Sequence, residues 1–285
     1  MSQFTDYAEN RLVDMVRGQG LTLPTDWHIA LGSVADDDTF TEIGFTDYAR
    51  VPVTRSLTNF LSTQGNDLAS TGTSHATSNS EDVDFGIAGS AGSATPNFFG
   101  FFDASTAGNC WMWVPIPAPT AISNGDPVLF PAGTIDLTLG LSGGFTDYLA
   151  NKLIDLIFRG QAFAWPANTY AAYTTTLPTN STPGTEPAVG GYARSVIASS
   201  MTAWASTQGN TAASTGTSGR TYNLAGISFP VPSANQGAIV GAELWDSAGA
   251  GNMLVWGTSG ATPITINAGP VAPSWPANAF GITFR

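Results

Sequence analysis

The sequence predicts a mainly β protein made of two tandem antiparallel β-sandwich domains, each opened by one amphipathic α-helix. The first observation is a repeat: Phe-Thr-Asp-Tyr at residues 4–7 recurs at residues 145–148. The second is the composition, because charged residues make up only 11% and small or turn-forming residues are abundant. The third is a series of short apolar alternations in each half. The predicted domains are residues 1–141 and 142–285, and a partly open barrel is the alternative to the sandwich.

Each predicted domain begins with a helix. Residues 4–17 and 147–158 place apolar residues at helical spacing with polar residues between them. Asp6, followed by Glu9 three residues later, has the form of a capping box, so Asp6 is the expected N-cap and Thr5 the alternative. Glycine follows each predicted helix, as is common where helices end.

The rest of each half is predicted to form short strands in the same order. A Tyr-Ala-Arg step occurs at residues 48–50 and 192–194, and a turn that runs from Asp to Asn, at residues 103–109 and 246–252, joins two strands of a hairpin. The expected strands are residues 27–31, 51–60, 98–102, 110–113 and 135–139 in the first half, and residues 169–173, 195–204, 242–245, 253–256 and 280–284 in the second.

One polar segment is repeated without change. Ala-Ser-Thr-Gly-Thr-Ser occupies residues 69–74 and again residues 213–218, and Thr-Gln-Gly-Asn precedes it at residues 63–66 and 207–210. Such identity indicates either a turn that needs glycine at positive φ or a shared contact surface. The turn is the favoured interpretation, because glycine adopts positive φ without steric cost.

Charge is divided unevenly between the halves. The net charge is −12; residues 1–141 carry 16 acidic and 4 basic residues, and residues 142–285 carry 5 of each. So acidic a chain is unsuited to nucleic acid, and we expect no direct binding to it. The difference also supports the hypothesis that the neutral second domain faces an assembly while the acidic first domain faces water. Neutral drift is the alternative explanation.

Other features bear on membranes, redox state and catalysis. We expect no membrane span and no signal peptide, because no stretch is apolar enough for the first and the start lacks the pattern of the second. The single cysteine, Cys110, excludes an intrachain disulfide and is expected to be a small core residue. His28 in a predicted strand and His75 in a polar turn are more typical of packing than of catalysis. No catalytic motif emerges, so we expect no enzymatic activity and no cofactor.

Two groups of residues remain as candidate sites. Asp36, Asp37 and Asp38 form a weak calcium candidate, because oxygen-rich loops bind this ion. They lack the alternating spacing of an EF-hand, so a solvated acidic loop is the favoured interpretation. Trp165 and Trp275 stand beside prolines in predicted loops and are the candidate partner contacts, including contacts to a glycan.

The order of these motifs resembles that of small virion structural proteins of tailed bacteriophages, among them proteins labelled as tail fibre. The matching stretches are residues 5–14, 24–31, 48–50, 103–109 and 135–139, and in the second half residues 146–155, 191–194 and 246–252. The proteins that it resembles are mostly single domains, whereas this chain carries two copies.

The resemblance implies a non-enzymatic structural protein of the virion, assembled in the host cytoplasm. A compact tandem of β-sandwich domains best fits a capsid decoration (cement) protein on the outer surface of the major capsid shell, where two similar domains would gain avidity. The alternative is a tail-fibre or tail-tip component that binds a host receptor or glycan. The expected partners are the major capsid protein or other virion proteins, with self-association around a symmetry axis.

Overall fold

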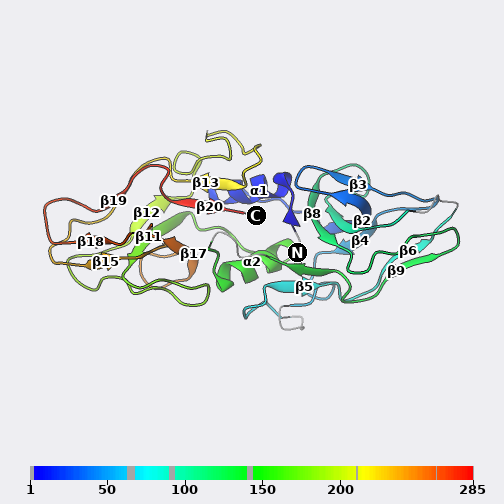
Figure 1. Cartoon of the computed structure of the whole chain (residues 1–285), viewed down its shortest axis with the longest axis horizontal. Helices are drawn as coiled ribbons and strands as arrows, with labels where there is room; N and C mark the ends of the chain where they lie inside the picture. Colours follow the sequence, from blue (N-terminus) through cyan, green and yellow to red (C-terminus); the bar gives the residue numbers. More distant parts are fainter. Residues whose placement is uncertain are drawn as a thin grey trace. The chain divides into compact units, whose positions relative to one another are not determined.

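The computed structural model describes residues 3–62, 68–89, 94–139, 144–209, 211–260 and 262–284. Within these residues the chain is mainly β, with two helices and several antiparallel sheets, which confirms the predicted fold class (Figure 1). The chain divides into two compact units. Unit 1 contains Met1–Glu9, Thr22–Gly140 and Asn151–Phe163, and unit 2 contains Asn10–Leu21, Leu141–Ala150 and Ala164–Arg285.

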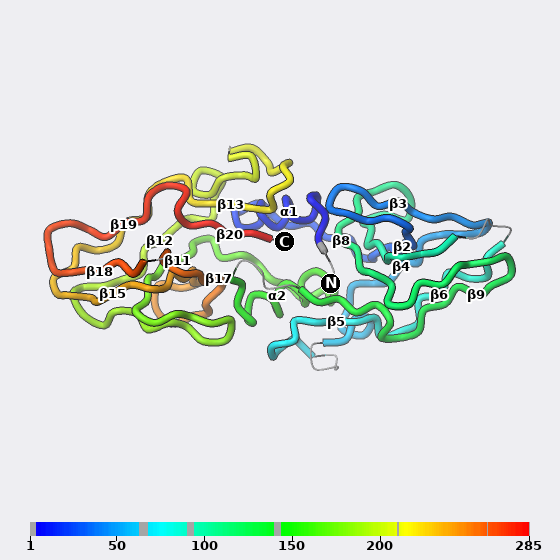
Figure 2. Tube along the Cα trace, viewed as in Figure 1, coloured from blue at the N-terminus to red at the C-terminus, as the bar shows by residue number. Residues whose placement is uncertain are grey.

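Each unit combines the strands of one repeat with part of the helix of the other. The unit boundaries fall inside both helices, α1 (Asp6–Val16) and α2 (Asp147–Ile157). The C-terminal part of α2 therefore belongs to unit 1, and the C-terminal part of α1 belongs to unit 2. The predicted domains, residues 1–141 and 142–285, are continuous stretches of sequence, whereas each unit is assembled from three segments. Figure 2 traces the chain through these segments, from the blue tube of α1 to the green tube of α2 and on to the yellow strand β13 (Arg220–Tyr222) of unit 2.

Both helices begin at a threonine N-cap. The Oγ1 atom of Thr5 accepts a hydrogen bond from the backbone N–H of Ala8 at 3.4 Å and donates one to the carbonyl of Cys110 at 2.6 Å. Thr146 makes the equivalent two bonds at the start of α2. The N-cap of α1 is thus Thr5, the alternative candidate, because Asp6 already lies in the first helical turn.

Unit 1 is built on a six-stranded antiparallel sheet. Its strands lie in the order β1 (Gln3–Phe4), β8 (Cys110–Pro115), β7 (Phe98–Phe102), β2 (Asp26–Ala35) and β3 (Phe40–Glu42), and β4 (Val51–Thr54) also pairs with β2. Two smaller pairs complete the unit: β5 (Ala76–Ser78) with β10 (Asp136–Thr138), and β6 (Val83–Ile87) with β9 (Pro127–Phe130).

Unit 2 repeats this plan with a four-stranded main sheet. Its main sheet has the order β12 (Ser195–Ala198), β11 (Asn168–Thr174), β16 (Gly241–Trp245) and β17 (Met253–Thr258). The smaller pairs are β13 with β20 (Gly281–Thr283), β14 (Ile227–Ser228) with β19 (Ser274–Trp275), and β15 (Gly237–Ile239) with β18 (Ile264–Ile266).

The two predicted hairpins are confirmed, as are the closing strands. β7 pairs with β8 and β16 pairs with β17, each across the loop that runs from Asp to Asn. The strands predicted at residues 51–60 and 195–204 are shorter than expected, since β4 and β12 end after four residues and a turn follows. Aromatic side chains form much of the core of unit 1, where Trp27, Phe99 and Phe101 are fully buried.

Candidate functional site

Residues that recur in both repeats gather where each unit receives the end of a helix. In unit 1, Asp155 of α2 forms a buried ion pair with Arg159, with Nη1 of Arg159 2.5 Å from Oδ1 of Asp155. The carboxylate also accepts hydrogen bonds from the backbone N–H and the hydroxyl of Ser70, at 2.8 and 2.7 Å. Arg159 donates to the carbonyls of Phe60 at 2.9 Å and Leu68 at 2.6 Å. Charged groups as well as apolar contacts therefore hold this helix.

Unit 2 repeats the arrangement with α1. The Nη1 atom of Arg17 lies 2.5 Å from Oδ1 of Asp14. Asp14 accepts hydrogen bonds from the backbone N–H and the hydroxyl of Ser214, at 3.0 and 2.8 Å. Arg17 donates to the carbonyl of Trp204 at 3.1 Å. Each of these contacts has its counterpart in unit 1, so the two sites share one design.

An asparagine one turn earlier supplies a second anchor. The Nδ2 atom of Asn151 donates to the carbonyl of Gly72 at 2.9 Å, and that of Asn10 donates to the carbonyl of Gly216 at 2.8 Å. Both glycines lie in the identical hexapeptides, residues 69–74 and 213–218, which we call the acceptor segments. The turn interpretation holds for Gly72, whose φ is +90°, but Gly216 has no left-handed φ. Binding a helix is the property that both segments share.

The ion pairs matter for stability because their charges cannot reach water. The side chains of Arg17 and Arg159 are fully buried. Removing one partner of a buried pair costs roughly 3–5 kcal/mol, since the other charge stays buried without its counterion. Helical periodicity placed these residues among the polar positions and missed their burial. A comparison of the two halves of the sequence could have identified these residues, because both halves keep the aspartate and an arginine directly before glycine.

The Tyr-Ala-Arg steps stabilise loops within each unit. The guanidinium of Arg50 makes bidentate contacts to Glu42, the shortest at 2.8 Å, and Arg194 does the same with Glu186 at 2.7 Å. Each guanidinium carbon also lies 3.6 Å from the centroid of an aromatic ring at the end of the hairpin. These recurrent residues therefore serve packing.

The hairpin aspartates serve turn formation, as their matched positions predicted. The carboxylate of Asp103 accepts hydrogen bonds from the backbone N–H and the Nδ2 atom of Asn109, at 2.7 and 2.9 Å. Asp246 binds Asn252 in the same way, at 2.7 and 2.8 Å. Both oxygens of each carboxylate are engaged inside their own loop.

The acidic calcium candidate lies in the exposed loop between β2 and β3. The Oδ1 atom of Asp36 accepts hydrogen bonds from the backbone N–H groups of Asp38 at 3.0 Å and Thr39 at 2.6 Å. No group of three or more His, Cys, Asp or Glu side chains able to hold a metal ion occurs in the described ranges. Calcium binding at Asp36, Asp37 and Asp38 stays a prediction, and the geometry assigns Asp36 a loop-closing contact.

The histidines and the cysteine lie in separate places. His28 is half-buried on β2 opposite Phe102, and His75 is buried directly after the first acceptor segment, with a φ of +49°. Burial raises the pKa of the Cys110 thiol to about 12, and Sγ donates to the carbonyl of Met112 at 3.4 Å. A thiol that keeps its proton at neutral pH is a poor nucleophile.

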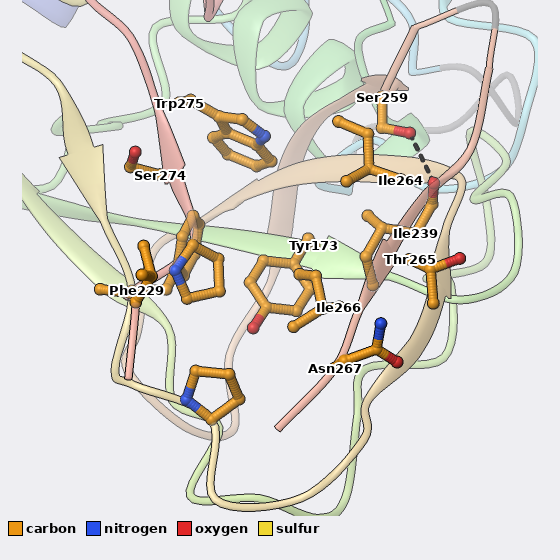
Figure 3. A pocket seen from close by; sticks show the side chains of 14 residues that line it. Tyr173, Phe229, Ile239, Ser259, Ile264, Thr265, Ile266, Asn267, Ser274 and Trp275 are labelled. Atoms are coloured by element: carbon orange, nitrogen blue, oxygen red, sulfur yellow. Dashed lines mark hydrogen bonds between the residues drawn. The ribbon is translucent and has the colours of Figure 1, made fainter. Parts of the chain in front are cut away.

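A cavity of about 250 Å³ is present in unit 2, and Trp275 lies in its wall (Figure 3). Phe229 lies beside Trp275, with ring centroids 5.0 Å apart, and beside Tyr173 at 4.6 Å. Isoleucines of β15 and β18, Ile239 and Ile264, face these aromatic rings from the other side in Figure 3. Burial raises the pKa of Tyr173 to about 12. The candidate contact residue is thus half-buried against other aromatic rings, and partner binding there stays a prediction.

Trp165, the other candidate contact, does not line this cavity. It is half-buried, and its buried Nε1 atom has no hydrogen-bond partner within the described part of the chain. The structure therefore does not bring the two tryptophans into one site.

The fold and these sites define a duplicated β-structural protein whose recurrent polar residues bind helices and close loops. A family model described as podophage GP4 fiber I protein gp80 matches residues 3–138 and 144–283. The chain belongs to this family. A search of curated proteins found no match.

The family match confirms the predicted class. The chain is a phage structural protein, located in the virion, with a duplicated domain. None of the helices in the described ranges has the length and apolar character needed to span a membrane.

Proposed function

We propose that this protein is a structural component of a podophage virion fibre. The observation that carries the proposal is the family match, which covers both repeats and whose description names a fibre protein. The role includes no enzymatic activity. In support, the recurrent polar residues with described contacts are engaged in helix binding and loop closure.

The exchange of helices suits a component that transmits force. Because unit 1 contains Asn151–Phe163 and unit 2 contains Asn10–Leu21, pulling the two repeats apart would withdraw a helix from each acceptor segment. Each withdrawal would break a buried ion pair and the serine and asparagine contacts around it. A duplicated chain of this kind resists separation of its repeats more strongly than two domains joined by a linker alone.

Other virion proteins are the partners that this function requires. The half-buried Trp275 and the exposed Ile264 and Val271 at the cavity of unit 2 are the apolar surface that we assign to such contact. Apolar residues beside aromatic rings are typical of interface cores, and the second repeat carries no net charge to oppose burial.

Capsid decoration is the second candidate, and it is favoured by the charge difference between an acidic and a neutral repeat. The copy number per virion separates the two functions, because a shell offers many equivalent positions and a tail offers few. Quantitative mass spectrometry of purified virions should find a few to a few dozen copies, and immunogold labelling should mark the tail. Hundreds of copies, with gold spread over the shell, would contradict the fibre proposal and support decoration.

A further inference from the structure

Each acceptor segment binds a helix from the other repeat. Residues 69–74 bind α2, and residues 213–218 bind α1, through the same asparagine and aspartate contacts. Two similar folding units that exchange an equivalent element in this way have the arrangement of a domain-swapped dimer, here formed within one chain. The single cysteine excludes a disulfide that would tie either helix to its acceptor within the chain.

We propose that the acceptor segments also take the helices of a second copy of this chain, so that chains join by exchanging helices. The asparagine and aspartate hydrogen bonds join only the helix and the acceptor segment. None of these bonds requires that the helix and the acceptor segment belong to one molecule. Within one chain, the covalent connection between the repeats gives each helix a high effective concentration at its acceptor segment, which favours exchange inside the molecule. The fraction of chains that exchange helices with a second copy should rise with the protein concentration.

The two acceptors are not interchangeable, because the spacing between the aspartate of the helix and the arginine that follows the helix differs between the repeats. The arginine of the ion pair follows the aspartate by three residues in α1, from Asp14 to Arg17, and by four residues in α2, from Asp155 to Arg159. The additional residue is Phe158, which directly follows α2 and whose side chain is fully buried in unit 1.

Unit 1 provides an aromatic pocket for Phe158. Its ring centroid lies 5.7 Å from that of Phe101, 5.8 Å from Phe60 and 6.4 Å from Trp27. In unit 2 the position of Phe60 is held by the larger Trp204, which is itself fully buried. An aromatic side chain arriving on the helix would compete with Trp204 for space, whereas α1, without that residue, would leave the pocket of unit 1 underfilled.

The carbonyls at the end of α2 add a second element of specificity. The Nε1 atom of Trp27 and the Nε atom of Arg55 donate to the carbonyl of the last helical residue, at 2.9 and 2.8 Å, and Arg55 also donates to the carbonyl before it. A cation is favoured at a helix C-terminus. The counterparts in unit 2, Thr169 and Ser199, carry no charge, and Thr169 donates to a neighbouring strand instead. Exchange between chains should therefore pair a first repeat with a second repeat.

The test uses the full chain in unlabelled and ¹⁵N-labelled forms. The forms are mixed, unfolded in urea, refolded at several protein concentrations and analysed by native mass spectrometry. We expect dimers that contain one chain of each label, in a fraction that rises with the concentration during refolding and persists after dilution. Monomers at every concentration, or dimers that fall apart at once on dilution, would overturn the proposal, because withdrawal of a buried helix requires local unfolding.

A second form of the full chain carries a protease site between Ser142 and Gly143 and is cleaved after folding. The two fragments should stay associated, and labelled and unlabelled fragments that are refolded together should form mixed pairs of a first with a second repeat. Separation into two folded fragments would refute helix exchange. Pairs of like fragments in equal amount would refute the specificity.

Variants of the cleaved chain test the specificity residues. Deletion of Phe158 gives α2 the spacing of α1 and should raise the share of pairs between two second-repeat fragments several-fold. Phe158→Leu keeps the spacing with a smaller side chain and is the matched control, so it should change the pairing less than the deletion does. Arg55→Ala, which leaves the spacing intact, should reduce the share of unlike pairs. If the three variants form the same pairs in the same proportions, Phe158 and Arg55 do not determine which repeats pair.

Discussion

Replacement of Asp155 by alanine tests the central stabilising contact. The substitution removes the carboxylate that accepts hydrogen bonds from the N–H and hydroxyl of Ser70 and pairs with Arg159 at 2.5 Å. The guanidinium of Arg159 then remains fully buried, still bound to carbonyls but without a countercharge. From the usual cost of breaking a buried pair, we expect the free energy of unfolding to fall by roughly 3–5 kcal/mol.

Urea unfolding followed by tryptophan fluorescence measures this change. Asp14→Ala should cause a loss of similar size, because Asp14 makes the same contacts in unit 2. The control is Asp37→Ala at an exposed position, which should change stability by less than about 0.5 kcal/mol. The double variant Asp155→Leu with Arg159→Met should recover much of the loss, since apolar residues need no countercharge.

The result that would refute this reasoning is a loss below about 1 kcal/mol for Asp155→Ala, close to the ordinary effect of a point substitution. Failure of the double variant to recover stability would point instead to the bonds with Ser70 as the main contribution, because that variant lacks them as well.

Three further predictions follow from local geometry. Gly18→Ala should lower the free energy of unfolding by more than about 1 kcal/mol, because Gly18 has a φ of +76° and a Cβ there would lie 2.2 Å from the carbonyl oxygen of Ser199. The control is Gly20→Ala, whose added Cβ meets nothing within 4 Å. Equal melting temperatures for the two variants would contradict the prediction. Burial raises the pKa of Cys110 from 9.0 to about 12, so the contribution of the protonated thiol to stability is complete below about pH 9 and is lost as the pH rises toward 12. In urea unfolding at alkaline pH, the free energy of unfolding should therefore fall more steeply for the native protein than for Cys110→Ala. Calcium should not raise the melting temperature, since Asp36 already accepts two N–H groups of its own loop; a rise reversed by a chelator would support the calcium candidate instead.

Features that depend on neighbours in the sequence were predictable. The helices expected at residues 4–17 and 147–158 agree with α1 and α2 to within two residues at each end. The hairpins were also correct, because their turns carry the residues that close them. The choice between Thr5 and Asp6 as N-cap was not decided by the capping-box pattern. The Thr5 hydroxyl also binds the carbonyl of Cys110, a contact about a hundred residues away in the chain.

The site was only partly predictable. Trp275 was found from its place beside a proline, and it lines the cavity of unit 2, whereas Trp165 is not part of that lining. The aspartates and arginines at the helix ends were missed, because charge and periodicity mark them as solvent-facing. Their burial depends on Ser70 and Ser214, which lie 85 and 200 residues from the aspartates that they bind.

The order of amino acids is enough to establish the duplication, the mainly β class, the positions of the helices and the membership of a phage virion family. The folded chain was needed to reveal that each helix completes the strands of the other repeat. The physical reason is that periodicity records which face of a helix is apolar and is silent about which repeat covers that face. The two identical acceptor segments offer the same serine and glycine hydrogen bonds to either helix. The choice between them rests on the fit of Phe158 in a pocket formed by residues distant in sequence, and on Arg55, which donates to the carbonyls at the end of α2.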